Sequence, residues 1–364
     1  MVISERPNAQ AAASEFQFRG EVLSLTPHGG GHINDTFLVT CQAFDATHRY
    51  ILQHINRHVF HDPVAVMQNI ERVTAHLATQ SAGKPDCERR TLHLVPSRDG
   101  RNWHVDAQRE TWRAYRFVEN ARTYETATST GQAYQAARAF GHFQQQLANL
   151  PPPRLHETIP DFHSTPKRVA ALDRAIDADA AGRASLAESE IEFARSRQSI
   201  AGILLDANLP ERITHNDTKF NNVLLDDKTG EAICVIDLDT VMPGLALYDF
   251  GDMVRTTTSP AKEDEQNLSQ VTMQFSMFEA LVRGYLETAG AFLTTAERNL
   301  LAFSGKLITF EIGIRFLTDY LSGDTYFKVH RESHNLDRCR TQFKLVESIE
   351  CQEESMNRLV ESLA

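Results

Sequence analysis

The chain has 364 residues, 41% of them hydrophobic, and a formal net charge of -11, which is the composition of an ordinary globular protein. Because this length exceeds the usual size of one domain, we expect two lobes. The negative charge, with no basic stripe to offset it, argues against a nucleic-acid-binding surface, and the five widely spaced cysteines without a C-x-x-C pair argue against a disulfide framework or a zinc site.

Two features of the sequence bear on localisation. Residues 1–15 lack both the apolar core and the basic leader of a signal peptide. No uninterrupted apolar run approaches the length of a membrane span. We therefore expect a cytoplasmic protein that does not bind membranes. The sequence predicts no oligomeric state.

The first predicted elements are two strands joined by a glycine-rich turn. Residues 21–40 alternate in polarity on either side of H-G-G-G-H at 28–32. Gly29, Gly30 and Gly31 can bring backbone N–H groups close to phosphates, and with His32 they form the predicted phosphate-binding turn. Any tight hairpin also uses glycine for positive φ, so the turn alone does not identify a nucleotide site.

A third strand and a helix follow. The strand covers 50–55, and the helix begins near residue 62. Glu71 lies in the middle of this helix, where a kinase places a carboxylate that orients a strand lysine. Gln53 occupies the place of that lysine, so we expect Gln53 to lie at the nucleotide site. Arg49, Arg57 and Lys219 are the candidate cations for the nucleotide phosphates.

Further strands are predicted at 91–95, 102–105 and 112–118, which would complete an antiparallel sheet. The segment R-F-V-E-N at 116–120 then resembles a hinge that offers backbone groups to adenine, with Phe117 and Glu119 as its predicted contacts.

Beyond the hinge the periodicity is mainly helical. We expect helices at 131–150, within 165–207, and near 264–288, 295–321 and 335–362. This order predicts an α+β, bilobal, protein-kinase-like fold. The small antiparallel-sheet N-lobe covers 1–118, and the larger, mainly helical C-lobe covers 119–364.

Chemistry concentrates in the segment I-T-H-N-D-T-K-F-N-N and in V-I-D-L-D, which follows after a predicted hairpin. Phosphoryl transfer to a hydroxyl needs a carboxylate beside the attacking oxygen, a cation for the phosphate and oxygen ligands for Mg²⁺. Asp217 is the predicted carboxylate and Lys219 the predicted cation. Asn222 follows Asp217 with the spacing of the kinase catalytic loop, and Asp237 comes at the end of an apolar strand. Asn222 and Asp237 are the predicted metal ligands.

Two neighbouring residues are interpreted as structural. Asp249-Phe250-Gly251 spells the protein-kinase metal motif but follows a turn-rich stretch, so we expect Asp249 to cap a helix that begins near Gly251. His215 is expected to brace the loop, because Asp217 already supplies the base.

Arg315 lies on a strongly apolar predicted helix. Glu311 and Asp319, each four residues away, are possible ion-pair partners. Recognition of an acidic or hydroxyl-bearing ligand is the equally weighted alternative.

The chain resembles the aminoglycoside phosphotransferase and choline kinase superfamily of small-molecule kinases, in which the motif H-x-D-x-x-x-x-N is complete. The stretches G-H-I-N-D-T-F-L-V-T, Y-I-L-Q, V-I-D-L-D-T-V-M-P-G and R-F-L-T-D-Y-L-S-G-D-T-Y-F are similar to those of N-acetylhexosamine 1-kinases, and the resemblance runs from about residue 16 to about residue 350. It implies an enzyme that uses ATP and Mg²⁺ to phosphorylate the anomeric hydroxyl of N-acetylglucosamine or N-acetylgalactosamine. It also implies that Asn34, Arg315 and Tyr326 bind the sugar. Asn216 departs from the glycine usual in aminoglycoside kinases, and we expect little effect on the chemistry.

Two alternatives accompany this expectation. One is a kinase for another small hydroxyl compound, such as homoserine, a choline-like amino alcohol or methylthioribose. The other is a catalytically inactive nucleotide-binding scaffold, which would be expected to lack Asp217, Asn222 or Asp237, and all three are present.

Overall fold

The computed structural model describes residues 8–29, 33–44 and 46–363. The chain divides into two compact units, and each is built from several segments of the sequence. Unit 1 comprises 1–121, 149–159 and 233–242, and unit 2 comprises 122–148, 160–232 and 243–364. The predicted division had a single boundary between residues 118 and 119, and it did not include the two later segments of unit 1.

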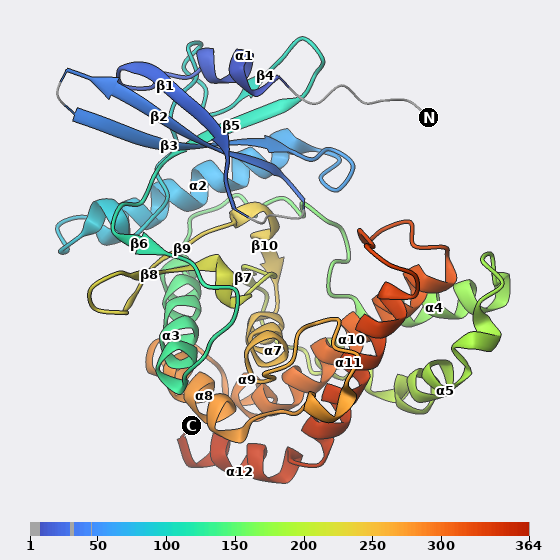
Figure 1. Cartoon of the computed structure of the whole chain (residues 1–364). Coiled ribbons are helices and arrows are strands. Elements are labelled where there is room, and N and C mark those ends of the chain that lie inside the picture. The colour runs from blue at the N-terminus through green and yellow to red at the C-terminus, as the bar shows by residue number, and fades with distance from the viewer. Residues whose placement is uncertain (1–7, 30–32, 45, 364) are drawn as a thin grey trace. The chain divides into compact units, whose positions relative to one another are not determined.

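A five-stranded antiparallel sheet is the centre of unit 1 (Figure 1). Its strands lie in the order β1-β2-β3-β5-β4. Their bounds are Glu21–Pro27 for β1, Asp35–Ala43 for β2, Ala46–Ile55 for β3, His104–Val105 for β4 and Thr111–Arg116 for β5. The segment 91–95, predicted as a strand, instead forms an isolated bridge between Leu94 and Tyr115, so its pairing with β5 is too short to make a strand.

The two faces of this sheet differ because side chains alternate along each strand. One face packs with α1 (Ala9–Ser14) in a buried cluster that includes Leu52 and Trp112. Gln53 and Arg113 are directly paired across β3 and β5 and lie on the opposite face. Two polar side chains thus lie on the face of the sheet that points away from α1, among apolar neighbours such as Ile51 and Ile55.

Helix α2 (Pro63–Ser81) begins as predicted, with the Asp62 side chain accepting a hydrogen bond from the N–H of Ala65. Asn69 of α2 is 1% exposed, and its hydrogen bonds connect α2 to both later segments of unit 1, 149–159 and 233–242. Its side chain bonds both the carbonyl and the N–H of His156, at 2.8 and 2.9 Å, and donates to the carbonyl of Val241 at 3.1 Å. One buried amide thus joins three distant stretches of sequence.

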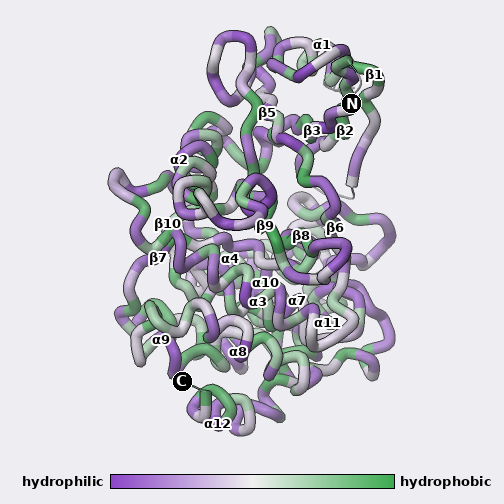
Figure 2. The backbone as a smooth tube through the Cα atoms, turned by 90° about the vertical axis from the view of Figure 1, so that its left-hand side faces the viewer, coloured by the Kyte–Doolittle hydropathy of each residue, from purple (hydrophilic) through white to green (hydrophobic). Residues whose placement is uncertain are grey.

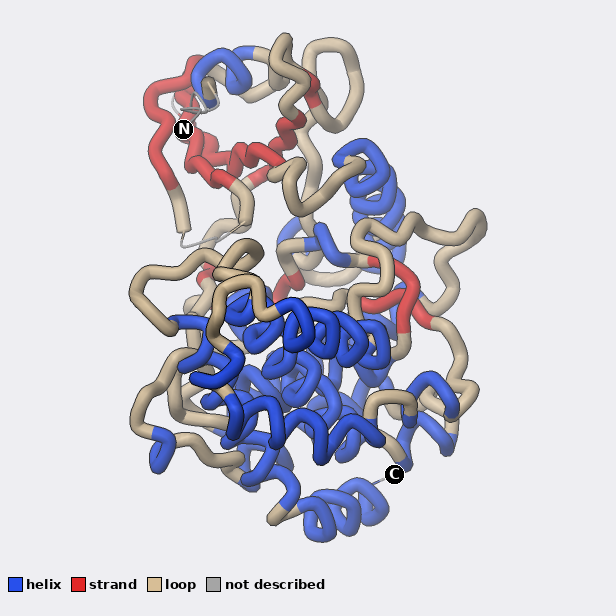
Figure 3. Tube along the Cα trace, turned by 90° about the vertical axis from the view of Figure 1, so that its right-hand side faces the viewer, coloured by secondary structure: helices blue, strands red, loops and turns tan. Residues whose placement is uncertain are grey.

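Unit 2 is mainly helical (Figure 3). Its helices are α3 (Thr130–Leu147), α4 (Thr165–Ala178), α5 (Glu188–Arg197), α6 (Ile203–Asp206), α7 (Ala246–Thr257), α8 (Phe275–Ala289), α9 (Thr295–Asn299), α10 (Leu301–Leu321), α11 (His334–Glu350) and α12 (Glu353–Leu363). Helix α10 is buried along almost its whole length and packs against α4, α7 and α11.

Short strands surround the predicted catalytic segments. In unit 2, β7 (Arg212–Thr214) and β8 (Val223–Asp226) flank the Asp217 segment. The chain passes from one unit to the other within β6 (Ala121–Arg122), β9 (Ala232–Val235) and β10 (Met242–Gly244).

Hydrophobic and hydrophilic residues are interspersed along most elements (Figure 2). Among the described helices, none combines the length and the apolar composition needed to cross a membrane.

Candidate active site

The segment between β7 and β8 brings three predicted residues together in unit 2. The ammonium of Lys219 lies 2.9 Å from Oδ1 of Asp217. The amide nitrogen of Asn222 donates to the backbone carbonyl of Asp217 at 2.8 Å and to its Oδ2 at 3.1 Å. The carboxylate, the cation and the amide therefore form one cluster, as the motif predicts.

The charges in this cluster reinforce one another. Burial alone would raise the pKa of Asp217, but the attraction and hydrogen bond of Lys219, together with His215 and Arg255, lower it. The same attraction raises the pKa of Lys219. Asp217 is therefore a carboxylate, and Lys219 a cation, across the neutral pH range.

Asn222 suits a hard cation. Its amide nitrogen is used by Asp217, and among the described residues none donates to its amide oxygen. This oxygen is the kind of ligand that Mg²⁺ prefers.

The Asp249 side chain holds the backbone of the segment that precedes Asp217. Its carboxylate accepts hydrogen bonds from the backbone N–H groups of His215 at 2.9 Å and Asn216 at 2.7 Å. The amide of Gln144 donates to the same carboxylate at 2.6 Å. The prediction that Asp249 caps the helix was wrong: α7 begins at Ala246, so Asp249 lies within its first turn and uses its side chain to hold the loop.

His215 lies between aromatic rings, with centroids 5.3 Å from Phe140 and 5.9 Å from Phe143. Its Nδ1 accepts a hydrogen bond from the N–H of Asp217 at 3.3 Å. These contacts suit a residue that braces the loop.

The second predicted metal ligand, Asp237, belongs to unit 1. It follows β9 with a left-handed backbone (φ 60°) and precedes a short 3₁₀ turn, Leu238–Thr240. Asp239, in the same segment, accepts from Arg113 and from the amide of Asn34. These contacts give Asp239 a structural role, and Asp237 stays the predicted metal ligand of this segment.

Arg113 is a buried residue of unit 1 that the sequence analysis did not single out. It is 1% exposed, pairs with Asp239, and donates through Nε to Oε1 of Gln53 at 2.9 Å. A buried cation therefore accompanies the glutamine that replaces the expected lysine. No ion pair joins Glu71 to a cation in the described part of the chain, and its carboxylate accepts a hydrogen bond from the Asn102 amide at 2.7 Å.

The other predicted nucleotide contacts have partners of their own. The Arg49 guanidinium pairs with Glu119 and lies 4.1 Å from the centre of the Phe117 ring. The N–H of Phe117 donates to the carbonyl of Arg49 at 3.1 Å, and the Glu119 carbonyl accepts from Arg89 at 3.0 Å.

Gly29 has the positive φ (74°) expected of a tight turn, and a Cβ added to it would meet no atom of the described residues within 4 Å. Gly30, Gly31 and His32 lie outside the described residues.

One prediction paired Arg315 with Glu311 or Asp319, and the structure does not show this ion pair. The carboxylate of Glu311 bonds His163 and Thr165, and Asp319 accepts three backbone N–H groups from 325–327. Among the described residues, no ion pair joins Arg315 to either acid. Its guanidinium instead faces three aromatic rings, those of Phe162, Tyr326 and Phe327, at 5.2 to 5.9 Å.

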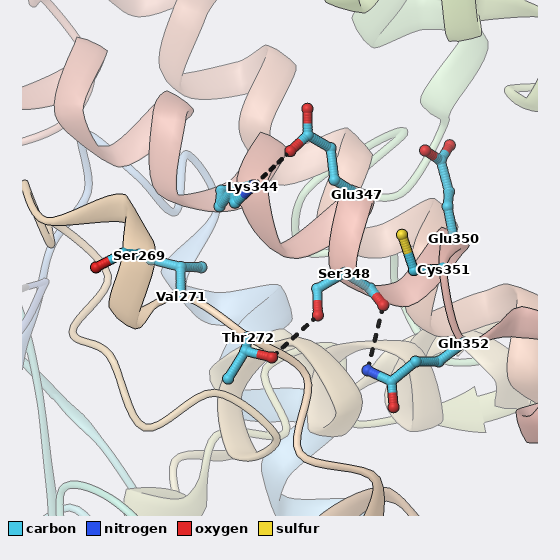
Figure 4. A pocket seen from close by; sticks show the side chains of 9 residues that line it. All are labelled: Ser269, Val271, Thr272, Lys344, Glu347, Ser348, Glu350, Cys351 and Gln352. Carbon is cyan, nitrogen blue, oxygen red and sulfur yellow. Dashed lines mark hydrogen bonds and ion pairs between the residues drawn. The ribbon is translucent and has the colours of Figure 1, made fainter.

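A separate pocket of about 700 Å³ lies at the C-terminal end of α11 (Figure 4). Thr272, Ser348 and Gln352 lie on its wall. None of the predicted site residues that the structure describes lines it, so it is distinct from the catalytic segment.

Comparison with known proteins agrees with this geometry. The family profile described as the phosphotransferase enzyme family matches residues 24–288. The chain belongs to this family.

Solved structures share its fold. An aminopropanol kinase associated with a microcompartment is 20% identical, with a TM-score of 0.57 and coverage of 96% of this chain and 98% of that one. A choline/ethanolamine kinase family protein from Mesorhizobium loti is 16% identical, with a TM-score of 0.53 and coverage of 97% and 98%. The aminoglycoside phosphotransferase APH(2'')-Ib, solved with ADP bound, is 12% identical, with a TM-score of 0.52 and coverage of 90% and 95%. The predicted protein-kinase-like α+β fold is thereby confirmed.

Proposed function

We propose that this phosphotransferase is an ATP- and Mg²⁺-dependent kinase that phosphorylates the anomeric C1 hydroxyl of an N-acetylhexosamine, giving the sugar 1-phosphate and ADP. The observation that carries the kinase assignment is the cluster of Asp217, Lys219 and Asn222 on one short loop. The sugar assignment rests on the resemblance to N-acetylhexosamine 1-kinases and on the surroundings of Arg315.

In the proposed mechanism the Asp217 carboxylate accepts the proton of the acceptor hydroxyl, or orients that hydroxyl for in-line attack. Lys219, whose pKa is raised by Asp217, remains charged and steadies the γ-phosphoryl group. Asn222 and Asp237 would hold Mg²⁺, which neutralises charge on the transferred phosphate.

On the nucleotide side, the glycine turn of Gly29, Gly30, Gly31 and His32 would cover the phosphates, and Phe117 and Glu119 would adjoin the adenine. Gln53 would lie beside the phosphates with Arg113 behind it. Arg113 is nearly fully buried, so it supports the site through Gln53 and Asp239 rather than by touching ATP.

On the acceptor side, Arg315 and Tyr326 would bind the sugar. The Arg315 guanidinium has donors not used by any ion pair among the described residues, and the Tyr326 side chain is 59% exposed on a backbone held by Asp319. Guanidinium donors suit the carbonyl of an acetamido group and sugar hydroxyls. Asn34 would join them, although its side chain also bonds Asp239 at 2.6 Å and the N–H of Asn56 at 3.0 Å.

The test is ADP release with MgATP and a panel of acceptors: N-acetylglucosamine, N-acetylgalactosamine, glucose, galactose, choline, aminopropanol and homoserine. Turnover with the N-acetyl sugars, abolished when C1 is capped as a methyl glycoside, is the expected result.

An Asp217→Asn variant should lose about 10²- to 10⁴-fold in kcat while keeping its thermal midpoint. Turnover near wild type in this variant would show that Asp217 is not the catalytic carboxylate.

A kinase for amino alcohols is the second candidate, favoured by the similarity to the aminopropanol and choline/ethanolamine kinases. A cationic acceptor needs anionic or aromatic surroundings, and Arg315 supplies a positive charge beside the aromatic rings. Turnover with choline or aminopropanol, and none with sugars, would favour this candidate and leave the catalytic assignments unchanged.

A further inference from the structure

A buried histidine and glutamate lie directly behind the catalytic segment of unit 2. His163 precedes α4 and Glu311 lies in the middle of α10, and their side chains are 3% and 0% exposed. Nδ1 of His163 is 2.8 Å from Oε1 of Glu311, and the Thr165 hydroxyl donates to Oε2 at 2.6 Å. Two elements distant in sequence are therefore joined through one carboxylate.

The other edge of the imidazole faces the catalytic segment. Nε2 of His163 lies 3.3 Å from the carbonyl oxygen of Asn216, the residue before Asp217. Asn216 has a left-handed backbone (φ 65°), and its N–H donates to Asp249. The backbone that enters Asp217 is thus held from two sides, by Asp249 at the N–H and by His163 at the carbonyl.

The chemistry of these contacts sets the protonation of the ring. A backbone carbonyl can only accept a hydrogen bond, and so can an ionised carboxylate. Burial alone would raise the pKa of Glu311, but the contacts with His163, the hydrogen bond from Thr165 and the charge of Arg315 together lower it, so Glu311 is an ionised acceptor. The geometry around His163, an acceptor at each ring nitrogen, is therefore satisfied when both nitrogens donate.

Among the described residues that contact the ring, only Glu311 carries a negative charge. Tyr248 of α7 packs with its ring centroid 4.9 Å from that of His163, and burial, followed by the charge of Glu311, raises the pKa of its hydroxyl, which stays neutral. Phe162 contacts the ring at 4.7 Å. Arg168 and Arg315 act on Glu311 from farther away. Glu311 is therefore the counter-ion of His163.

We propose that His163 is a positioning residue: Glu311 holds it as an imidazolium, and its Nε2–H fixes the Asn216 carbonyl and so orients Asp217. The proposal rests on the proposed kinase function for its kinetic consequence, but the protonation state of the ring is independent of substrate.

A Glu311→Gln variant removes the negative charge of residue 311 and keeps nearly the same side-chain shape. The amide keeps an acceptor for Nδ1–H and a group for Thr165, but it no longer stabilises the imidazolium. Without its counter-ion the ring should lose its Nε2 proton more readily than in the wild type and release the Asn216 carbonyl.

The expected kinetic result is a pH signature. At about pH 8 the kcat of E311Q should fall about 10- to 100-fold with KM nearly unchanged, because a displaced carboxylate loses the aligned geometry. Activity should recover toward wild type as the pH falls to about 6. The matched control is Glu190→Gln, which removes another buried carboxylate of unit 2 from its pair with Arg340 without touching the loop. E190Q should show no new pH step, and a flat, wild-type profile in E311Q as well would overturn the proposal.

A second measurement needs neither activity nor the E311Q variant. In wild-type protein carrying ¹⁵N-labelled histidine, the His163 signal, assigned by its loss in His163→Gln, should show two protonated ring nitrogens at about pH 7.5. A neutral tautomer would overturn the proposal even if the kinase activity is as proposed. Two protonated nitrogens without turnover on any acceptor would support the imidazolium and count against the proposed function instead.

Discussion

At the scale of single residues, local spacing made the catalytic loop predictable. Asp217, Lys219 and Asn222 lie within one short loop, so their order in the sequence nearly fixes their contacts. Arg113 and His163 could not be found this way. Their partners, Asp239, Glu311 and Asn216, lie far away in the chain, and nothing near either residue signals the contact.

Lys219 should determine the pH at which kcat/KM falls on the acidic side of the pH–rate profile. Because its charge lowers the pKa of Asp217 against the effect of burial, Lys219→Met should raise that pKa. The base must be ionised to act, so the acidic limb of the kcat/KM profile should move to higher pH. Lys219→Arg, which keeps the charge, is the control and should leave the limb in place. An unmoved limb in the methionine variant would contradict this account.

At the scale of elements, strands and capped helices followed from periodicity and end signals, as in β3 and α2. The helix predicted from residue 264 was wrong in its first part, because α8 begins only at Phe275. The charged residues of 263–266 suit a helix in composition. Their side chains instead bind other elements: Glu263 pairs with Arg255 of α7, and Asp264 pairs with Arg331 ahead of α11. Tertiary ion pairs thus replace local helix formation.

The pairing of β5 with the Asp237 segment should depend on Arg113. Arg113→Met leaves Asp239, 4% exposed in its side chain, as an unpaired buried carboxylate. We expect a loss of about 3–5 kcal/mol in the free energy of unfolding, measured by urea denaturation. Adding Asp239→Asn to this variant should restore part of the loss. Equal instability of the single and double variants would argue that packing, not charge, dominates.

Gly251 should determine how closely α7 approaches α10. A Cβ at this position would lie 2.5 Å from the backbone oxygen of Ser304 and 2.6 Å from Ile308. Gly251→Ala should therefore lower the free energy of unfolding by about 1–3 kcal/mol. Gly131→Ala in α3 is the control, because its Cβ would meet only the Ser129 hydroxyl at 3.8 Å. Similar thermal midpoints for the two variants would show that the helices separate easily.

At the scale of the whole molecule, length and element order predicted two lobes. They did not predict which segments of the chain belong to each unit. Segments 149–159 and 233–242 belong to unit 1. Asn69 holds both through bonds to His156 and Val241. An asparagine in a helix carries no sequence signal for such contacts, so a single cut in the chain was the natural prediction.

Nucleotide binding should stabilise the protein as a whole. A ligand that binds the folded state alone adds about 2.7 kcal/mol at a concentration 100 times its Kd. MgADP should therefore raise the thermal midpoint, and EDTA should remove much of the increase. In Asp237→Asn the magnesium-dependent part of the shift should shrink. A full shift that persists in this variant would exclude Asp237 as a metal ligand.

The loop that carries Tyr326 has a consequence for how this enzyme can change. Asp319 accepts the N–H groups of Thr325, Tyr326 and Phe327 at 2.8 to 2.9 Å, and Asn335 donates to the same carboxylate. The path of the loop is therefore set by main-chain contacts, while the Tyr326 side chain is largely exposed. Substitutions at 325–327 can vary the chemistry of this surface without rebuilding its scaffold. Because Tyr326 is proposed to bind the acceptor, a mutant library aimed at new acceptors would start from this loop, with Asp319 and Asn335 kept constant.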